Sequence, residues 1–194
     1  MPIHQYEGWS YERLRQQRNR AHFLLEDPYR YVTVLLISKP GRPEELACID
    51  SPCYHAAGPL GEGDIVEIED LLCLRCPWHR YLVNIENGEE ILLKVDPTSE
   101  QGAGMVGRHA PLPTYPMPFI DPSTEGVTVV HGQKVQRVHR AWLEETTGIL
   151  SIEVGEEADM RRHPIKSDKP AGNVKNGGMC MQIFDIKSRG LDKL

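Results

Sequence analysis

The sequence predicts an all-β domain that is preceded by a short N-terminal helix. From residue 28 onward, short runs of alternating or β-branched residues are separated by turn signals every eight to twelve positions, as in antiparallel sheets. Asn87-Gly88 and Thr147-Gly148 each lie between two such runs, and Asn-Gly favours the type I′ turn of a tight hairpin. Residues 9–25 instead contain no Gly or Pro and are rich in Arg, Gln and Leu, which favours a helix.

The expected helix comes first along the chain, with Ser10 as its N-cap. Residues 1–27 are therefore interpreted as a helical extension, and residues 28–155 as the main domain. At 194 residues the chain is long enough for one domain with a real core. The strands expected in this domain cover residues 31–38, 46–50, 64–69, 71–75, 81–85, 90–95, 127–131, 135–144 and 150–154.

Two segments differ in composition from these strands. Residues 97–122 are rich in Pro and Gly and have no sustained periodicity, and a loop of this length in a small domain is usually functional or disordered. Residues 156–194 form a C-terminal tail that begins polar. Residues 179–187 regain an apolar alternation, which makes them a candidate edge strand.

Composition excludes several classes of function. The chain has 22 Lys and Arg against 28 Asp and Glu, a net charge of -6, and no long basic stripe, so nucleic acid is not an expected partner. The longest apolar run, residues 34–37, is too short for a membrane span. The N-terminus carries Glu7 and Glu12 and has no apolar core, so no targeting signal is expected. Five Cys, an odd number, favour a reducing compartment, and the expected localisation is cytoplasmic.

Two short pairs carry the chemistry: Cys53-Tyr-His55 and, after twenty intervening residues, Cys76-Pro-Trp-His79. Each pair fits a tight loop, and together they place two thiolates and two imidazoles around one metal centre. This is the ligand set of a Rieske [2Fe-2S] cluster, in which two Cys hold one iron and two His hold the other. We therefore predict one such cluster per chain, bound by Cys53, His55, Cys76 and His79.

Other sites compete for the same residues. Cys73 and Cys76 form a C-x-x-C pair, but a thioredoxin-like dithiol would open a helix, and a strand-like run follows here. A c-type haem site would need His where Pro77 stands. Structural zinc accepts two Cys and two His, although the alternation of Cys and His within each loop disfavours it. The zinc site remains the main alternative.

The flanking residues extend the pattern. The stretches CYHAAGPLGEGDI, from residue 53, and CPWHRY, from residue 76, resemble the cluster-binding region of Rieske ferredoxins, and in particular the soluble animal-type Rieske domain-containing proteins. This resemblance implies three stacked antiparallel sheets and a small cluster-binding subdomain with ligand loops 53–60 and 76–81. It also implies that Cys53 and Cys76 bind a buried iron, while His55 and His79 bind an outer iron.

The loops depart from the respiratory Rieske proteins, which resemble C-T-H-x-G-C and C-P-C-H-G-S. Gly58 and Trp78 stand where that pattern has the two additional Cys that form a disulfide, and Tyr81 stands where it has a Ser that donates a hydrogen bond to a cluster sulfur. Fewer hydrogen bonds to sulfur stabilise the added electron less. The sequence therefore predicts a reduction potential of about -150 to 0 mV, near the low end of the Rieske range.

These features predict a soluble electron carrier with no catalytic residues of its own. The expected donor is a flavoprotein reductase, and the expected acceptor is an oxygenase or another metalloenzyme. The alternatives are a small Rieske subunit of an oxidoreductase complex, as in nitrite reductases, and a zinc-stabilised interaction module. Cys48 and Cys73 are expected to be packing residues, with a disulfide between them as the minor alternative. Residues 111–122 are either a loop over the cluster or a surface insertion.

Overall fold

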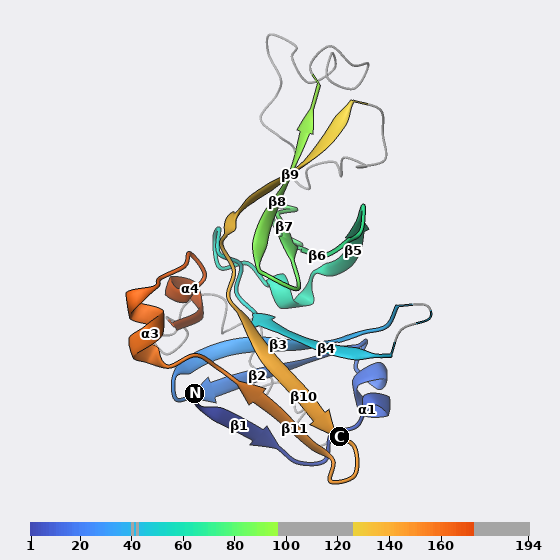
Figure 1. Ribbon diagram of the computed structural model, residues 1–194, viewed down its shortest axis with the longest axis vertical. Helices are drawn as coiled ribbons and strands as arrows, with labels where there is room; N and C mark the ends of the chain where they lie inside the picture. The colour runs from blue at the N-terminus through green and yellow to red at the C-terminus, as the bar shows by residue number, and fades with distance from the viewer. Residues whose placement is uncertain (40, 42, 97–125, 173–194) are drawn as a thin grey trace.

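The structure is a computed structural model that describes residues 1–39, 41, 43–96 and 126–172. It contains a six-stranded sheet with strand order β1-β11-β10-β4-β3-β2 and a five-stranded sheet with order β5-β6-β7-β8-β9. Figure 1 shows the five-stranded sheet beside the strands β3 and β4 of the larger sheet, with β9 leading into β10. All paired strands are antiparallel.

The bounds of the elements follow the chain. The strands are β1 (Ile3–Tyr6), β2 (Arg20–Glu26), β3 (Tyr29–Ile37), β4 (Glu45–Asp50), β5 (Asp64–Ile68), β6 (Leu71–Arg75), β7 (Leu82–Asn84), β8 (Glu89–Val95), β9 (Val127–Lys134), β10 (Val138–Glu144) and β11 (Ile149–Glu153). The helices are α1 (Tyr11–Gln16), α3 (Glu157–Arg162) and α4 (Asp168–Gly172), with a 3-10 turn η1 (Leu60–Glu62).

The larger sheet consists of two parts that share β10. Val138 and His139 pair with β4, whereas Arg140 to Glu144 pair with β11. Counted in this way, the described residues form three antiparallel sheets, and the predicted all-β fold class is confirmed. Each of the nine predicted strands overlaps one of the strands from β3 to β11.

The predicted helix over residues 9–25 is wrong in its length. Ser10 Oγ accepts a hydrogen bond from the Arg13 amide at 3.0 Å, as expected for an N-cap, but α1 has only six residues. The chain then turns through Arg18 and Asn19, both with positive φ, and continues as β2. Every second residue of β2 is buried, the period of a strand. Strands β1 and β2 thus join a sheet where a helical extension was expected.

Both predicted hairpins are present. Gly148, with φ of +68°, turns the chain from β10 to β11. Gly88, with φ of +77°, lies between β7 and β8. A type I′ turn needs positive φ at both central residues, and in residues 85–88 only Gly88 has it, so that turn type is wrong. Gly88 is required for a second reason, because an added Cβ would lie 1.9 Å from the Gln136 carbonyl oxygen.

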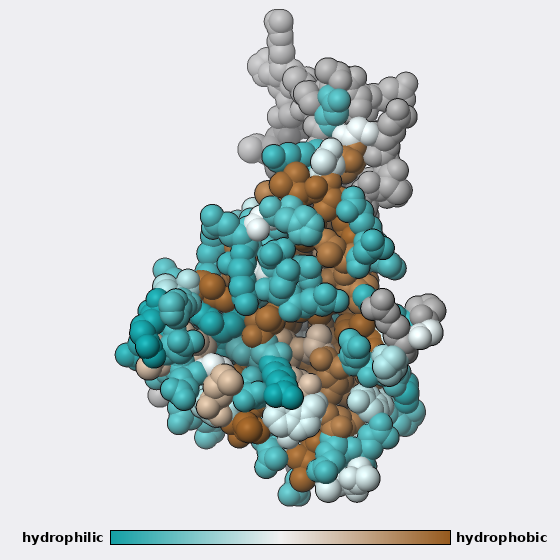
Figure 2. All heavy atoms as spheres, viewed as in Figure 1, coloured by the Kyte–Doolittle hydropathy of each residue, from teal (hydrophilic) through white to brown (hydrophobic). Residues whose placement is uncertain are grey.

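Residues 156–172 contain α3 and α4, which the polar composition of the tail did not predict. Figure 1 shows both helices beside the larger sheet, on the side where β4 ends and the chain continues to the smaller sheet. The Pro-rich segment at 97–122 and the candidate edge strand at 179–187 lie outside the described residues. Figure 2 shows, on the face in view, an apolar band that continues from the smaller to the larger sheet.

An apolar core between the two sheets brings the predicted ligand loops together. Its buried members come from both sheets and from both loops, and Cys53 and Cys76 are among them. The other members are Leu35, Ile49, Leu60, Leu74, Val83 and Ile85. The two thiols are therefore fixed by the same packing that joins the sheets.

A buried ion network lies where β4 ends, three residues before Cys53. The Asp50 carboxylate is fully buried and accepts two hydrogen bonds from the Arg30 guanidinium, at 2.7 and 2.6 Å. His139 Nε2 lies 2.9 Å from the same carboxylate. Burial alone would raise the pKa of Asp50, but the charge and hydrogen bonds of Arg30 and the contact with His139 outweigh it and lower the pKa to about 2.

The network extends to α4 through two further side chains. Ser167 donates a hydrogen bond of 2.5 Å to Asp50 Oδ2. Asp168 accepts hydrogen bonds from Arg30, at 2.6 Å, and from Arg137, at 2.7 and 2.6 Å. Strands β3 and β4, the start of β10 and α4 are thus joined around one carboxylate.

We expect Asp50→Asn to lower the free energy of unfolding by about 3–5 kcal/mol, because it leaves the Arg30 charge buried without its main partner. Urea unfolding followed by far-UV circular dichroism measures this change. Asp64→Asn is the matched control, since Asp64 also pairs with an arginine, Arg75, but its side chain is 64% exposed. The control should cost less than about 1 kcal/mol, and equal losses in the two variants would contradict the network's role.

We also expect the free energy of unfolding to fall by about 2 kcal/mol as pH drops from about 4 to 2. The pKa of Asp50 in the folded protein, about 2, lies below its ordinary value of 3.8, so the folded state binds fewer protons than the unfolded state in this window. The stabilisation is complete above pH 4 and is lost as the carboxylate becomes protonated. Urea unfolding at several pH values checks this, and Asp50→Asn should show a smaller pH dependence.

Candidate metal centre

The first predicted ligand loop closes on its own backbone. The Cys53 amide donates to the Gly58 carbonyl at 2.8 Å, and the Ala57 amide donates to the Cys53 carbonyl at 2.9 Å. Ala57 has a positive φ of 54°, which lets the chain reverse within five residues. An isolated bridge between Pro52 and Pro59 then fixes the base of the loop.

The second loop repeats this pattern. The Cys76 amide donates to the Tyr81 carbonyl at 2.8 Å, and the Arg80 amide donates to the Cys76 carbonyl at 2.9 Å. Arg80 has a positive φ of 63° and stands four residues after its Cys, as Ala57 does in the first loop. The two Cys-His pairs therefore lie on loops of matching backbone geometry, although their Cys-to-His spacings differ.

The two thiols lie together inside the protein. Cys53 and Cys76 are buried and share a hydrogen bond. The contact between the two thiols lowers the pKa of Cys76 and raises that of Cys53, because a thiolate at one sulfur favours the protonated form at the other. Backbone amides two and three residues after each Cys, namely His55 and Ala56 for Cys53 and Trp78 and His79 for Cys76, also donate to its sulfur. These amides favour negative charge at both sulfur positions, which is the form of the thiols that ligation requires.

The two imidazoles lie together nearer the surface. The His55 and His79 ring centroids are 4.7 Å apart, and the rings are almost perpendicular. His55 is exposed and His79 is partly buried. The Tyr81 ring packs against His55 with centroids 4.4 Å apart. The structure thus brings all four predicted ligands into one region as a buried sulfur pair and an outer nitrogen pair.

The surroundings of the sulfurs fit a compact metal group. A Cβ added at Gly58 would lie 3.0 Å from the Trp78 ring and 3.2 Å from Cys76 Sγ, so a larger residue would crowd this sulfur. Leu60 is fully buried, and Trp78 packs against the same core. The two thiols and two imidazoles form a donor set that suits the predicted cluster, and apolar residues line the inner side of the site.

Gln136 supports the first loop and was not predicted from the sequence. Its buried side chain accepts a hydrogen bond from the Tyr54 amide at 3.0 Å and donates to the carbonyls of Asp50 and Pro52, both at 2.8 Å. Three backbone groups around Cys53 are thus fixed by one amide. Gln136 falls within the predicted strand 135–144, and no feature of the sequence distinguishes it from a polar surface residue.

The remaining Cys and His residues take other roles. Cys48 and Cys73 are buried free thiols, so the alternative of a disulfide between them is wrong and packing is confirmed. Burial raises the pKa of Cys73 to about 12. His22 and His139 are hydrogen-bonded within the fold. Cys180 and His109 lie outside the described residues.

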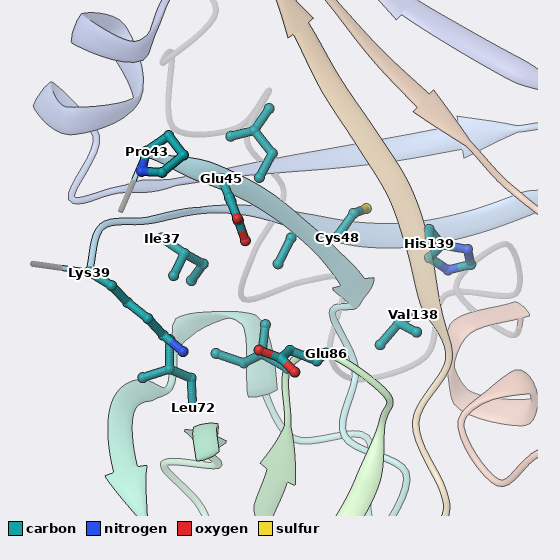
Figure 3. Close-up of a pocket in the computed structure, with 12 residues that line it drawn as sticks. Ile37, Lys39, Pro43, Glu45, Cys48, Leu72, Glu86, Val138 and His139 are labelled. Carbon is teal, nitrogen blue, oxygen red and sulfur yellow. The ribbon is translucent and has the colours of Figure 1, made fainter. Parts of the chain in front are cut away.

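A cavity of about 250 Å³ lies between the two sheets, away from the predicted ligands (Figure 3). Ile37, Leu72 and Val138 contribute to its apolar wall, and Glu45 and Glu86 direct their carboxylates toward it.

Within the described ranges, no three His, Cys, Asp or Glu side chains are grouped so that they could hold one metal ion. A [2Fe-2S] cluster of the predicted type takes only two protein ligands for each iron.

None of the helices in the described part of the chain has the length and apolar character of a transmembrane segment. Residues 32–105 match the family model described as soluble Rieske-type ferredoxin. A human protein named Rieske domain-containing protein is 38% identical over 53 residues, which are 27% of this chain and 34% of that protein. The match thus covers about a third of the human relative.

The matched residues 32–105 include both ligand loops and the core between the sheets. A Rieske-type domain implies a [2Fe-2S] cluster and supports a role in iron–sulfur electron transfer. The sequence, the β architecture and the family match agree: residues 32–105 are similar to the soluble Rieske-type ferredoxins, and the chain is similar to the human Rieske domain-containing protein.

Proposed function

We propose that the chain holds one [2Fe-2S] cluster on Cys53, His55, Cys76 and His79 and serves as a soluble one-electron carrier. The observation that carries this proposal is the pairing of the ligands, with hydrogen-bonded thiols inside and adjacent imidazoles outside. When bound, the cluster would accept and release one electron. The protein would supply no catalytic residue, so its role is that of a carrier and not of an enzyme.

The residues around the site have three tasks in this function. Backbone amides directed at the two sulfurs stabilise negative charge there. Leu60 and Trp78 exclude water from the inner side of the site. The exposed His55 and its neighbour His79 provide the outer edge through which an electron would leave.

The proposed donor is a flavoprotein reductase, and the proposed acceptor is an oxygenase or another metalloenzyme in the cytoplasm. The net charge of -6 supports transient docking to basic patches on such partners, because complementary charge raises the encounter rate more than the affinity. The second candidate function is a small Rieske subunit of an oxidoreductase complex. A subunit would copurify with a large partner, whereas a carrier would purify alone and work in trans.

The first test is a set of ligand substitutions. We expect Cys53→Ser and Cys76→Ser to lose more than about nine-tenths of the bound iron and acid-labile sulfide, because each removes one of two thiolates on the same iron. Cys48→Ser is the control, since Cys48 is also a buried free thiol but lies in a strand. The control should keep its iron, sulfide and visible colour.

Two outcomes would contradict this assignment. Loss of colour in the Cys48 control as well as in the ligand variants would remove the distinction between ligand and packing residues. Zinc without acid-labile sulfide in the unsubstituted protein would favour the interaction module that zinc stabilises.

The second test is the reduction potential. We expect a midpoint of about -150 to 0 mV, because the site lacks the loop disulfide and the serine hydroxyl that raise the potential of respiratory Rieske proteins. Titration followed by EPR spectroscopy of the reduced protein measures it. A midpoint above about +200 mV, within the upper Rieske range, would contradict the proposed low-potential carrier.

A further inference from the structure

Two side chains of β2, Arg20 and His22, contact the segment that closes the first ligand loop. Both lie outside residues 32–105, the part of the chain that matches the family model. We propose that Arg20 and His22 are positioning residues that fix the orientation of the loop carrying Cys53 and His55. This inference rests on the proposed function, because the position of the loop matters through the cluster that it would hold.

Arg20 holds the end of the loop through backbone carbonyls. Its Nη1 donates to the Gly61 carbonyl at 2.8 Å and to the Gly63 carbonyl at 3.0 Å. The two carbonyls flank Glu62, at the end of η1, so the guanidinium fixes the chain where it leaves the loop for β5. Arg20 is partly buried, and burial lowers its pKa. Partial burial of a guanidinium has a desolvation cost. The two hydrogen bonds to the Gly61 and Gly63 carbonyls offset this cost, so the contact depends on the position of these carbonyls.

His22 connects both ends of the same loop. Its Nε2 lies 2.9 Å from Glu62 Oε1, after the loop, and its Nδ1 lies 2.9 Å from Thr33 Oγ1. Thr33 in turn donates to Ser51 Oγ at 2.9 Å, before the loop. Thr33 and Ser51 are buried. A single imidazole on β2 thus joins the residues that enter and leave the ligand loop.

The loop base has no spare room at this contact. A Cβ added at Gly61 would lie 2.0 Å from Thr33 Oγ1 and 2.6 Å from Ser51 Oγ. The Gly61 amide also donates to the Ser51 carbonyl at 3.1 Å. The loop base therefore lies directly on the β2–β3 hairpin, and a shift of this hairpin would move Cys53 and His55.

The contacts of Arg20 and His22 support only the first of the two ligand loops. Cys76 and His79 lie on the loop between β6 and β7. Apart from a bond of Arg20 to the nearby Arg18 carbonyl, the described side-chain hydrogen bonds of Arg20 and His22 reach the surroundings of the first loop. Ligation of one cluster requires the two loops to keep a fixed relative position. Loss of the β2 contacts would free one ligand pair relative to the other.

The test compares three substitutions in the purified protein. Arg20→Ala should speed hydrogen–deuterium exchange of the peptide that spans residues 51–63 by about 5- to 30-fold, because two charged hydrogen bonds are lost. Arg20→Lys should restore much of the protection, since one Nζ can donate to both carbonyls. Arg13→Ala is the matched control, because Arg13 also donates to a backbone carbonyl, that of Gly8, at 2.7 Å.

The second readout is the EPR spectrum of the reduced protein, which a merely structural residue would leave unchanged. We expect Arg20→Ala to broaden or shift the signal, Arg20→Lys to resemble the unsubstituted protein, and Arg13→Ala to match it. His22→Ala provides a second variant in case Arg20→Ala does not fold, and it should affect exchange in the same peptide. Unchanged exchange and EPR signal in both alanine variants, or equal changes in the Arg13 control, would overturn the proposal.

The exchange experiment also separates this proposal from the proposed function. If the unsubstituted protein contained no iron and sulfide, the carrier function would fail, while the exchange comparison would still show whether Arg20 and His22 hold the loop. If the cluster were present and the Arg20→Ala spectrum and exchange were unchanged, the positioning role alone would fail.

Discussion

A single buried carboxylate, that of Asp50, joins the parts of the molecule on which the ligand loops depend. It lies at the end of β4, where the chain leaves the larger sheet for the loop that carries Cys53 and His55. Arg30, His139 and Ser167 all contact it. Because a buried charge without partners is strongly unfavourable, β3, β10 and the start of α4 must keep their places around it. The position of the first loop follows from that requirement.

The two ligand loops show how different sequences reach the same geometry. Each loop begins with Cys, accepts a hydrogen bond on that carbonyl from the amide four residues later, and places a residue with positive φ at that position. His55 follows its Cys by two residues and His79 by three. The matched backbones therefore direct both sulfurs inward, and the difference in spacing affects only where each imidazole emerges.

The sequence predicted the strands more reliably than it predicted their supports. Strands β3 to β11 were found because alternation and turn residues are local signals. Strand β2 was missed because its Leu and Arg content also suits a helix, and its partner β3 decided its conformation. The Cys-His pairs were identified from their spacing, but the supporting roles of Gln136 and Asp50 were not. A polar residue in a predicted strand is expected to be exposed unless its distant partners are known. Those partners are 82 and 20 residues away.

The site has a buried side, formed by the two thiols, and a side that is open to solvent at His55. Charge at the sulfurs is stabilised by backbone amides, within the core that joins the sheets. The imidazoles lack that cover, and His55 is open to solvent. An electron partner would thus approach over the histidine side, where the distance to the site is shortest. The Tyr81 ring packs against His55 on this side, so the residue that stands in place of the respiratory serine shapes the surface that a partner would meet.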